Sequence, residues 1–229
     1  MADDKSRDEP MTILLRFGYP EETPIDATIF RPLKAQKDDW AQIRYGQVLE
    51  SPGERILLLD WISYHAWARF SESSHYQELL ANLGAHSNFK PVIQAVNFNR
   101  FCPSQPLSPH TEFRTAYFPA SISSETRQAL PKVRGLVTTA AFGPRLQHLS
   151  PYALPPIFGW VRGTQKWEGE DAVACVWIHT WNSERTEEKF KTTNWLPRFK
   201  DGILSKPLAV DLFEQELKDL GALGWNDYH

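Results

Sequence analysis

Cysteine is scarce in this chain: two residues among 229, far apart at Cys102 and Cys175. Two isolated cysteines form neither a disulfide framework nor a pair of metal ligands, so we expect both to be packing residues. The sequence also lacks a His, Cys and carboxylate cluster with ligand spacing, so it predicts neither a metal site nor a haem site.

Long apolar runs and an excess of positive charge are missing as well. No stretch reaches the roughly 18 apolar residues of a membrane-spanning helix, and the first ten residues, MADDKSRDEP, are charged where a secretory signal is apolar. Lys and Arg number 25 against 28 Asp and Glu, a net charge of −3, without a basic run to neutralise phosphates. We therefore expect a cytoplasmic protein with no membrane and no nucleic-acid partner.

The common catalytic motifs are absent too. The sequence has no nucleophile elbow, phosphate-binding glycine loop, HExxH motif or dinucleotide fingerprint, which leaves hydrolase, kinase and nicotinamide chemistry unsupported. What it does have is 13% aromatic residues, including nine Trp, within an ordinary globular composition of 41% hydrophobic and 23% charged residues. Such a content predicts large apolar surfaces or a lined cavity.

The sequence contains one unit twice. Residues 47–99 align with residues 165–217 at a nearly constant offset, and upstream MTILLRFGYP, ending at Pro20, resembles HTEFRTAYFP, ending at Pro119. The second copy carries an additional Pro-rich stretch over residues 143–156, which is typical of a loop. The clearest anchors pair Trp61 with Trp181, Ser63 with Ser183, Phe70 with Phe190, and Lys90-Pro91 with Lys206-Pro207.

Apolar periodicity predicts the order β-α-β-β-α-β in each copy. This is the ferredoxin-like pattern of an antiparallel sheet with helices on one face. In the first copy the predicted strands cover residues 12–17, 40–50, 55–61 and 92–98. The predicted helices cover 22–37, interrupted at Pro32, and 63–83, with a break near Ser73. In the second copy the strands cover 112–118, 157–168, 172–180 and 208–213, and the helices cover 124–142 and 183–204.

The repeat also predicts the domain organisation and the fold class, which is α+β. We expect a disordered tail over residues 1–10, a ferredoxin-like unit over 11–99, a linker over 100–109, a second unit over 110–217 and a C-terminal tail over 218–229. The bare faces of two such sheets can cover one another within one chain at a low cost in association entropy. The chain is therefore expected to be a monomeric pseudo-dimer, with a homodimer as the alternative.

Several short motifs resemble a known family. Gly46-Gln47, Glu50-Ser51-Pro52, Trp61-Ile62-Ser63, Phe70 and Ser74-His75-Tyr76 resemble the dimeric α/β barrel superfamily, in particular the antibiotic-biosynthesis-monooxygenase-like proteins common in fungi, here in tandem. The resemblance implies an intramolecular dimeric α/β barrel. It also implies a family of cofactor-independent monooxygenases, haem-degrading enzymes, polyketide cyclases and isomerases. A His that the family often carries six residues after the strand-ending Trp is replaced here by Trp67 and Glu187.

The first copy offers five candidate site residues. His75 is a candidate catalytic residue and His65 a substrate-binding one, because imidazole transfers protons near neutral pH; the alternative for both is a surface or capping role. Tyr45 is a second catalytic candidate, and Gln94 and Asn97 are substrate-binding candidates, because polar groups on sheet strands can bind a carbonyl or phenol. Hydrogen bonding within the fold is the alternative for these three.

The second copy offers three more candidates. Trp160 and Arg162 alternate on the strand predicted over residues 157–168, and His179 lies on the next strand. An inward Arg162 would hold a carboxylate or enolate and is the third catalytic candidate, whereas an outward one is solvated. Trp160 and His179 are substrate-binding candidates, and the alternative for aromatic residues is the core.

These candidates and the family resemblance lead to a functional hypothesis. We expect a small-molecule enzyme of specialised metabolism that needs no cofactor and acts as a cyclase, isomerase or monooxygenase. Its substrate would be hydrophobic or aromatic and polyketide- or terpenoid-like. The alternative is a non-catalytic ligand-binding or stress-response α/β barrel protein, because no acid/base pair is evident in the sequence.

Overall fold

The computed structural model describes residues 9–49, 51–100, 111–130, 152–153, 157–186 and 209–219, the last range as backbone only. These residues form two compact units. The first includes the described residues up to Asn97, and the second includes Phe98–Arg100 and the described residues from Thr111 to Gln215. Among the described helices, none is long and apolar enough to cross a membrane.

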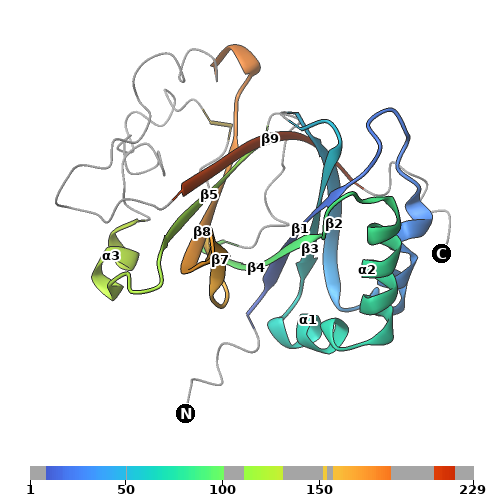
Figure 1. Cartoon of the computed structure of the whole chain (residues 1–229), viewed down its shortest axis with the longest axis horizontal. Coiled ribbons are helices and arrows are strands. Elements are labelled where there is room, and N and C mark those ends of the chain that lie inside the picture. The colour runs from blue at the N-terminus through green and yellow to red at the C-terminus, as the bar shows by residue number, and fades with distance from the viewer. Residues whose placement is uncertain are drawn as a thin grey trace. The chain divides into compact units, whose positions relative to one another are not determined.

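The first unit is an antiparallel sheet with helices on one face (Figure 1). Neighbouring strands pair in the order β2-β3-β1-β4. The expected α+β class with an antiparallel sheet is thereby confirmed, and the arrangement is consistent with the ferredoxin-like fold. Its elements are β1 (Met11–Gly18), the 3-10 helix η2 (Ala27–Gln36), β2 (Trp40–Val48), β3 (Glu54–Trp61), α1 (Tyr64–Ser71), α2 (Ser74–His86) and β4 (Val92–Phe98).

Serine side chains determine where the two α-helices begin. Ser63 Oγ accepts from the backbone N–H of Ala66, and Ser73 Oγ accepts from that of Tyr76, so each supplies an N-cap. The predicted break near Ser73 is therefore confirmed, and it divides the long helix into α1 and α2. The helix predicted over residues 22–37 is wrong in type and length, because η2 is a 3-10 helix that contains Pro32, which has no N–H to donate.

The core of the first unit lies between the sheet and its helices. Alternate residues of each strand point to this side, as the period-2 pattern requires. Trp61 is fully buried there against the rings of Trp67 and Phe70, at centroid distances of 5.7 and 5.1 Å. The other buried members include Met11, Ile13, Leu15, Phe17, Leu57, Leu59, Leu79 and Leu83.

The second unit has the corresponding strand order. Strand β5 lies between β8 and β9, and both β6 and β7 pair with the other edge of β8, always antiparallel. The described elements are β5 (Thr111–Pro119), α3 (Ser124–Ala129), β6 (Ile157–Val161), β7 (Gln165–Trp167), β8 (Glu170–Thr180) and β9 (Ala209–Asp219). Most of the helices predicted over residues 124–142 and 183–204 lies outside the described residues, as do residues 101–110 and most of 143–156.

The single strand predicted over residues 157–168 is wrong, because the chain bends after Val161. Gly163 stands in this bend with a φ of +74°, a conformation that suits glycine. Strand β7 then turns into β8 through Glu168 and Gly169, whose φ angles of 49° and 88° are both positive. Two consecutive residues with positive φ are typical of a type I′ hairpin turn.

Candidate functional site

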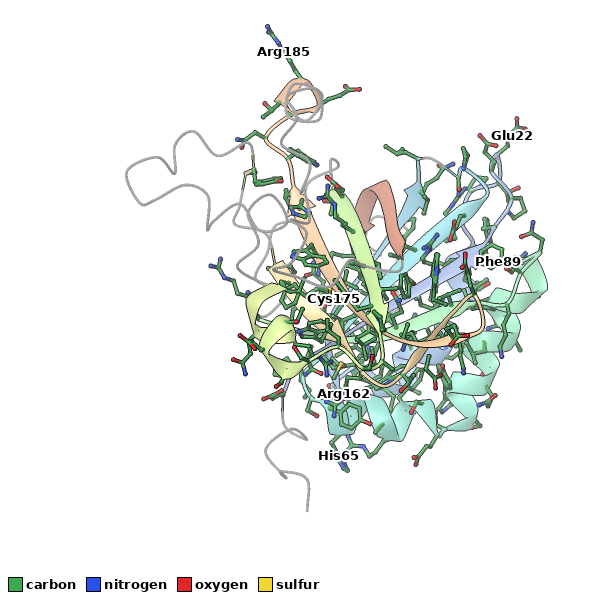
Figure 2. The ribbon with its side chains drawn as sticks, turned by 60° about the vertical axis from the view of Figure 1, so that its left-hand side comes forward. Glu22, His65, Phe89, Arg162, Cys175 and Arg185 are labelled. Carbon is green, nitrogen blue, oxygen red and sulfur yellow. The ribbon has the colours of Figure 1, made fainter. Side chains whose placement is uncertain are left out.

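The candidate residues of the first unit do not come together. His65 is exposed on α1 (Figure 2). His75 lies in the first turn of α2, where its Nδ1 is 4.0 Å from Oε2 of Glu78 and its side chain is 45% exposed. Tyr45 is buried in the apolar core on the helix side of β2.

The two amides on β4 are also apart. Gln94 is buried and pairs in register with Leu14, on the sheet face opposite the helices. Asn97 is three residues further along the strand and therefore on the other face, where its Nδ2 donates to Oε2 of Glu9 over 3.3 Å. The structure thus gives Asn97 a local partner within the same unit.

A buried ion pair lies on the face of the first sheet that is opposite its helices. Arg44 Nη2 donates to Oδ2 of Asp60 over 2.6 Å, and Thr12 Oγ1 donates to Oδ1 over 2.7 Å. Both charged side chains are almost completely buried. Both oxygens of the Asp60 carboxylate thus accept hydrogen bonds from side chains on the same sheet, on the face that carries no helices.

The second unit holds a denser polar group on the helix side of its sheet. Glu112 and Arg114 are two residues apart on β5 and share a face, which also carries the buried Ala116 and Phe118. Arg114 Nη2 donates to Oε1 of Glu112 over 2.6 Å, and the two side chains are 6% and 0% exposed. This is a buried ion pair on the side where a sheet normally carries its core.

Three aromatic side chains complete this group. Trp181 Nε1 donates to the second carboxylate oxygen of Glu112, Oε2, over 3.0 Å. His179 is fully buried and lies directly opposite Glu112 in the β5–β8 register. The ring of Tyr152 lies 5.0 Å from that of His179 and 4.5 Å from that of Trp181. We call Glu112, Arg114, Tyr152, His179 and Trp181 the Glu112 cluster.

Comparison with the first unit reveals how unusual the Glu112 cluster is. The repeat alignment, which matches Pro20 with Pro119 and Trp61 with Trp181, sets Glu112 against Ile13 and His179 against Leu59. Ile13 faces Leu59 in the first unit, and Glu112 faces His179 at the corresponding place in the second. The fold therefore needs no charge at these positions. Placing charges in a protein interior costs several kcal/mol per ion before pairing, so their presence marks a candidate functional site.

Trp160 and Arg162 lie outside the Glu112 cluster. Trp160 is half-buried on β6, with the guanidinium carbon of Arg127 4.5 Å from its ring centroid. Arg162 lies in the bend after β6 and is partly exposed (Figure 2), and its carbonyl accepts from Nε2 of Gln165 over 3.4 Å. The prediction that Arg162 shares a strand face with Trp160 is wrong, because the strand ends at Val161.

Of the eight candidates named from the sequence, His179 alone belongs to the Glu112 cluster. The sequence reasoning missed Glu112, Arg114, Tyr152 and Trp181. A usable signal existed for Glu112 and Arg114, because the repeat alignment sets them against Ile13 and Leu15 of an apolar strand. No such signal existed for Tyr152, which forms an isolated backbone bridge with Trp181, directly after β8.

The thiol of Cys175, on the strand that carries His179, is unreactive. Cys175 is buried on the same face of β8, with its Sγ 3.8 Å from the carbonyl oxygen of Ala116. Burial raises the pKa of this thiol well above its ordinary value, so it remains protonated and unreactive at neutral pH. Its packing role agrees with the sequence expectation.

The donor set of the Glu112 cluster suits proton transfer better than metal binding. Within the part of the chain that the structure describes, no three His, Cys, Asp or Glu residues are placed to hold a metal ion. An imidazole opposite a carboxylate is instead the arrangement that general acid–base catalysis uses.

No family model matches the chain, and no curated protein matches it by sequence. Solved structures do match in fold. An anthrone oxidase-like protein matches with a TM-score of 0.50 and 11% identity, over 94% of this chain and 95% of its own. A haem-binding protein from Thermus thermophilus matches with a TM-score of 0.46 and 14% identity, over 94% of each chain.

Shorter chains match part of the protein. An antibiotic biosynthesis monooxygenase matches with a TM-score of 0.31 and 18% identity, over 38% of this chain and 94% of its own. The structural neighbours thus include an antibiotic biosynthesis monooxygenase and an anthrone oxidase-like protein. At these identities the likeness concerns the fold.

Proposed function

We propose that the chain is a small-molecule enzyme that needs no cofactor and has its active site at the Glu112 cluster. The observation that carries the proposal is the buried Glu112–Arg114 pair, with His179 opposite it, on the sheet face that is apolar in the first unit. Charged residues at positions whose counterparts in the first unit are apolar are costly to bury, which supports a role in chemistry.

The roles follow from the groups present. His179 is the residue that accepts the substrate proton, because a neutral imidazole is a base near neutral pH. Glu112 stabilises the resulting imidazolium, and Arg114 balances the carboxylate in the absence of substrate. Tyr152 and Trp181 supply aromatic faces next to His179, which suits a planar aromatic substrate.

The reaction that this site supports best is oxidation of an activated aromatic CH₂ group by O₂. Removal of one proton gives a stabilised carbanion that reduces O₂ directly. One oxygen atom then becomes the new carbonyl oxygen, and the other leaves as water with the two hydrogens of the CH₂ group. The reaction balances without an external reductant. The anthrone oxidase-like neighbour makes an anthrone the natural first probe.

The finer features of the fold belong to the same proposal. We take the two units to be tandem copies that form an intramolecular dimeric α/β barrel, and the enzyme to act on a polyketide-like aromatic compound of specialised metabolism in the cytoplasm. The matching strand orders and the matched Trp61 and Trp181 support the duplication. A cyclase or isomerase would use the same proton transfer without consuming O₂.

The test is oxygen uptake by the purified full chain with an anthrone, in buffer containing a chelator and no flavin. The wild type is expected to consume O₂ and form the anthraquinone, and His179→Gln is expected to lower the rate by about 10²–10⁴-fold. His75→Gln, which changes an exposed His in the first unit, is the control and should retain full activity. Product formation without O₂ uptake, or an unaffected His179→Gln variant, would overturn the proposal. Binding without turnover would favour the ligand-binding alternative.

A further inference from the structure

Both oxygens of the Glu112 carboxylate accept a hydrogen bond, one from a residue of β5 and the other from the residue that follows β8. Arg114, on β5 itself, donates to Oε1 over 2.6 Å. Trp181, directly after β8, donates to Oε2 over 3.0 Å. A carboxylate anchored at both oxygens cannot rotate about its terminal bond, so its position relative to β8 is fixed.

The β5–β8 register places this fixed carboxylate opposite His179. Residues directly opposite in an antiparallel pair have their Cβ atoms about 4.5–5.5 Å apart. Arg114 lies opposite Trp177, one same-face position further along the strands. Among the described residues that face His179, Glu112 is therefore the charged residue closest to it along the strands, and Arg114 is the next closest. Tyr152, whose ring lies beside that of His179, is the remaining titratable residue.

We infer that Trp181 is a positioning residue, which holds Glu112 against His179 so that the carboxylate raises the proton affinity of the imidazole. That Trp181 matters for catalysis rests on the proposed function. The physical content of the inference is independent of any substrate, because an anion close to an imidazole favours the protonated ring. Loss of the indole N–H removes the donor that holds Oε2 on the β8 side, so the remaining bond to Arg114 draws the carboxylate toward β5.

The first unit provides the matched control. Trp61 occupies the position that corresponds to Trp181, and its buried Nε1 has no hydrogen-bond partner in the described part of the chain. Ile13 stands there in place of Glu112, so no acceptor faces the indole. The same substitution, Trp to Phe, therefore removes a hydrogen bond in one unit and only ring volume in the other.

The experiment compares Trp181→Phe with Trp61→Phe by following the histidine imidazoles of the ¹⁵N-labelled full chain as a function of pH. The His179 signal is assigned by its loss in His179→Gln. We expect Trp181→Phe to lower the titration midpoint of His179 by about 0.5 pH units or more, a threefold loss in proton affinity. Trp61→Phe should leave the midpoint unchanged, and in the active enzyme only Trp181→Phe should shift the pH profile of kcat/KM.

A second variant makes the test independent of how well Trp181→Phe folds. Glu112→Gln keeps an oxygen for the indole to bind but removes the negative charge, so it should also lower the midpoint. An unchanged midpoint in both variants, or equal shifts in Trp181→Phe and Trp61→Phe, would overturn the inference. Because the titration needs no substrate, an inactive wild type would overturn the proposed function alone.

Discussion

Trp181 donates its indole N–H to Glu112 over 3.0 Å, whereas Trp61, the corresponding residue of the first unit, makes no such bond within the described residues. Trp61 is the last residue of β3 and Trp181 directly follows β8, and both are buried. What differs is the residue opposite, a carboxylate in one unit and Ile13 in the other. Trp61 thus packs in an apolar core, whereas Trp181 takes part in a polar site.

Substitution of Arg114 should lower the free energy of unfolding. Arg114→Met leaves the Glu112 carboxylate buried without its cation, and breaking a buried pair in this way destabilises a protein by about 3–5 kcal/mol. Urea unfolding followed by tryptophan fluorescence measures the change. The double variant Glu112→Leu with Arg114→Met should recover most of the lost stability, because neither charge then remains buried.

An exposed pair of the same hydrogen-bond length serves as the control. Lys166 Nζ lies 2.6 Å from Oδ1 of Asp171, but the side chains are 70% and 59% exposed. Lys166→Met should change the free energy of unfolding by less than about 1 kcal/mol, because water and salt screen such pairs. Equal losses in Lys166→Met and Arg114→Met would mean that burial is not the cause.

The secondary structure of the first unit was largely predictable because its signals are local. Alternating apolar residues give the strands, and the N-cap serines Ser63 and Ser73 give the helix starts, so short stretches suffice. The error at η2 has a local cause too, since Pro32 interrupts the hydrogen bonding of an α-helix. The bend after β6 could also have been predicted, because Gly163 follows Arg162 directly.

The candidate site was less predictable because it depends on contacts between residues far apart in sequence. Strand periodicity places Glu112 and Arg114 on one face, but it does not reveal whether that face is buried. The hydrogen bond between Trp181 and Glu112 joins residues 69 positions apart in the sequence, and strand periodicity does not fix the register that brings them together. Tyr45 illustrates the same point, since its hydroxyl suggested chemistry while its strand position places the ring in an apolar core.

The helix side of the first unit should behave as an ordinary core. Leu83 on α2 is fully buried, so Leu83→Ala should lower the free energy of unfolding by about 2–5 kcal/mol through lost contacts and a residual cavity. Leu49→Ala, the same change at a 55% exposed position, should cost less than about 0.5 kcal/mol. Chemical denaturation of both variants measures the difference, and a small loss at Leu83 would contradict the packing described here.

Cys175 should resist thiol reagents until the protein unfolds. In a Cys102→Ser background, where it is the remaining cysteine, a chromogenic disulfide should react at pH 8 only after denaturant is added. Because burial raises the pKa of the folded thiol, the unfolded chain loses this proton first as the pH increases. Stability from this group is therefore complete below about pH 9 and falls above it. Rapid labelling of the native protein would contradict this prediction.

The charge of the Glu112 cluster should also select among substrates. Arg114 already pairs with Glu112, so the cluster offers no free cation to a substrate carboxylate, and Glu112 repels one. An anthrone that carries a ring carboxylate should therefore have a KM at least about tenfold higher than its neutral parent, with the larger effect on KM than on kcat. Glu112→Gln should reduce the difference in KM between the two substrates, because it removes the repelling charge and leaves Arg114 able to bind the substrate carboxylate. Steady-state oxygen uptake with the two substrates measures this difference in KM. If the wild type preferred the carboxylate-bearing substrate, the prediction would be wrong and a cationic site elsewhere would be required. Arg162, in the bend after β6, is the first residue to substitute in that case.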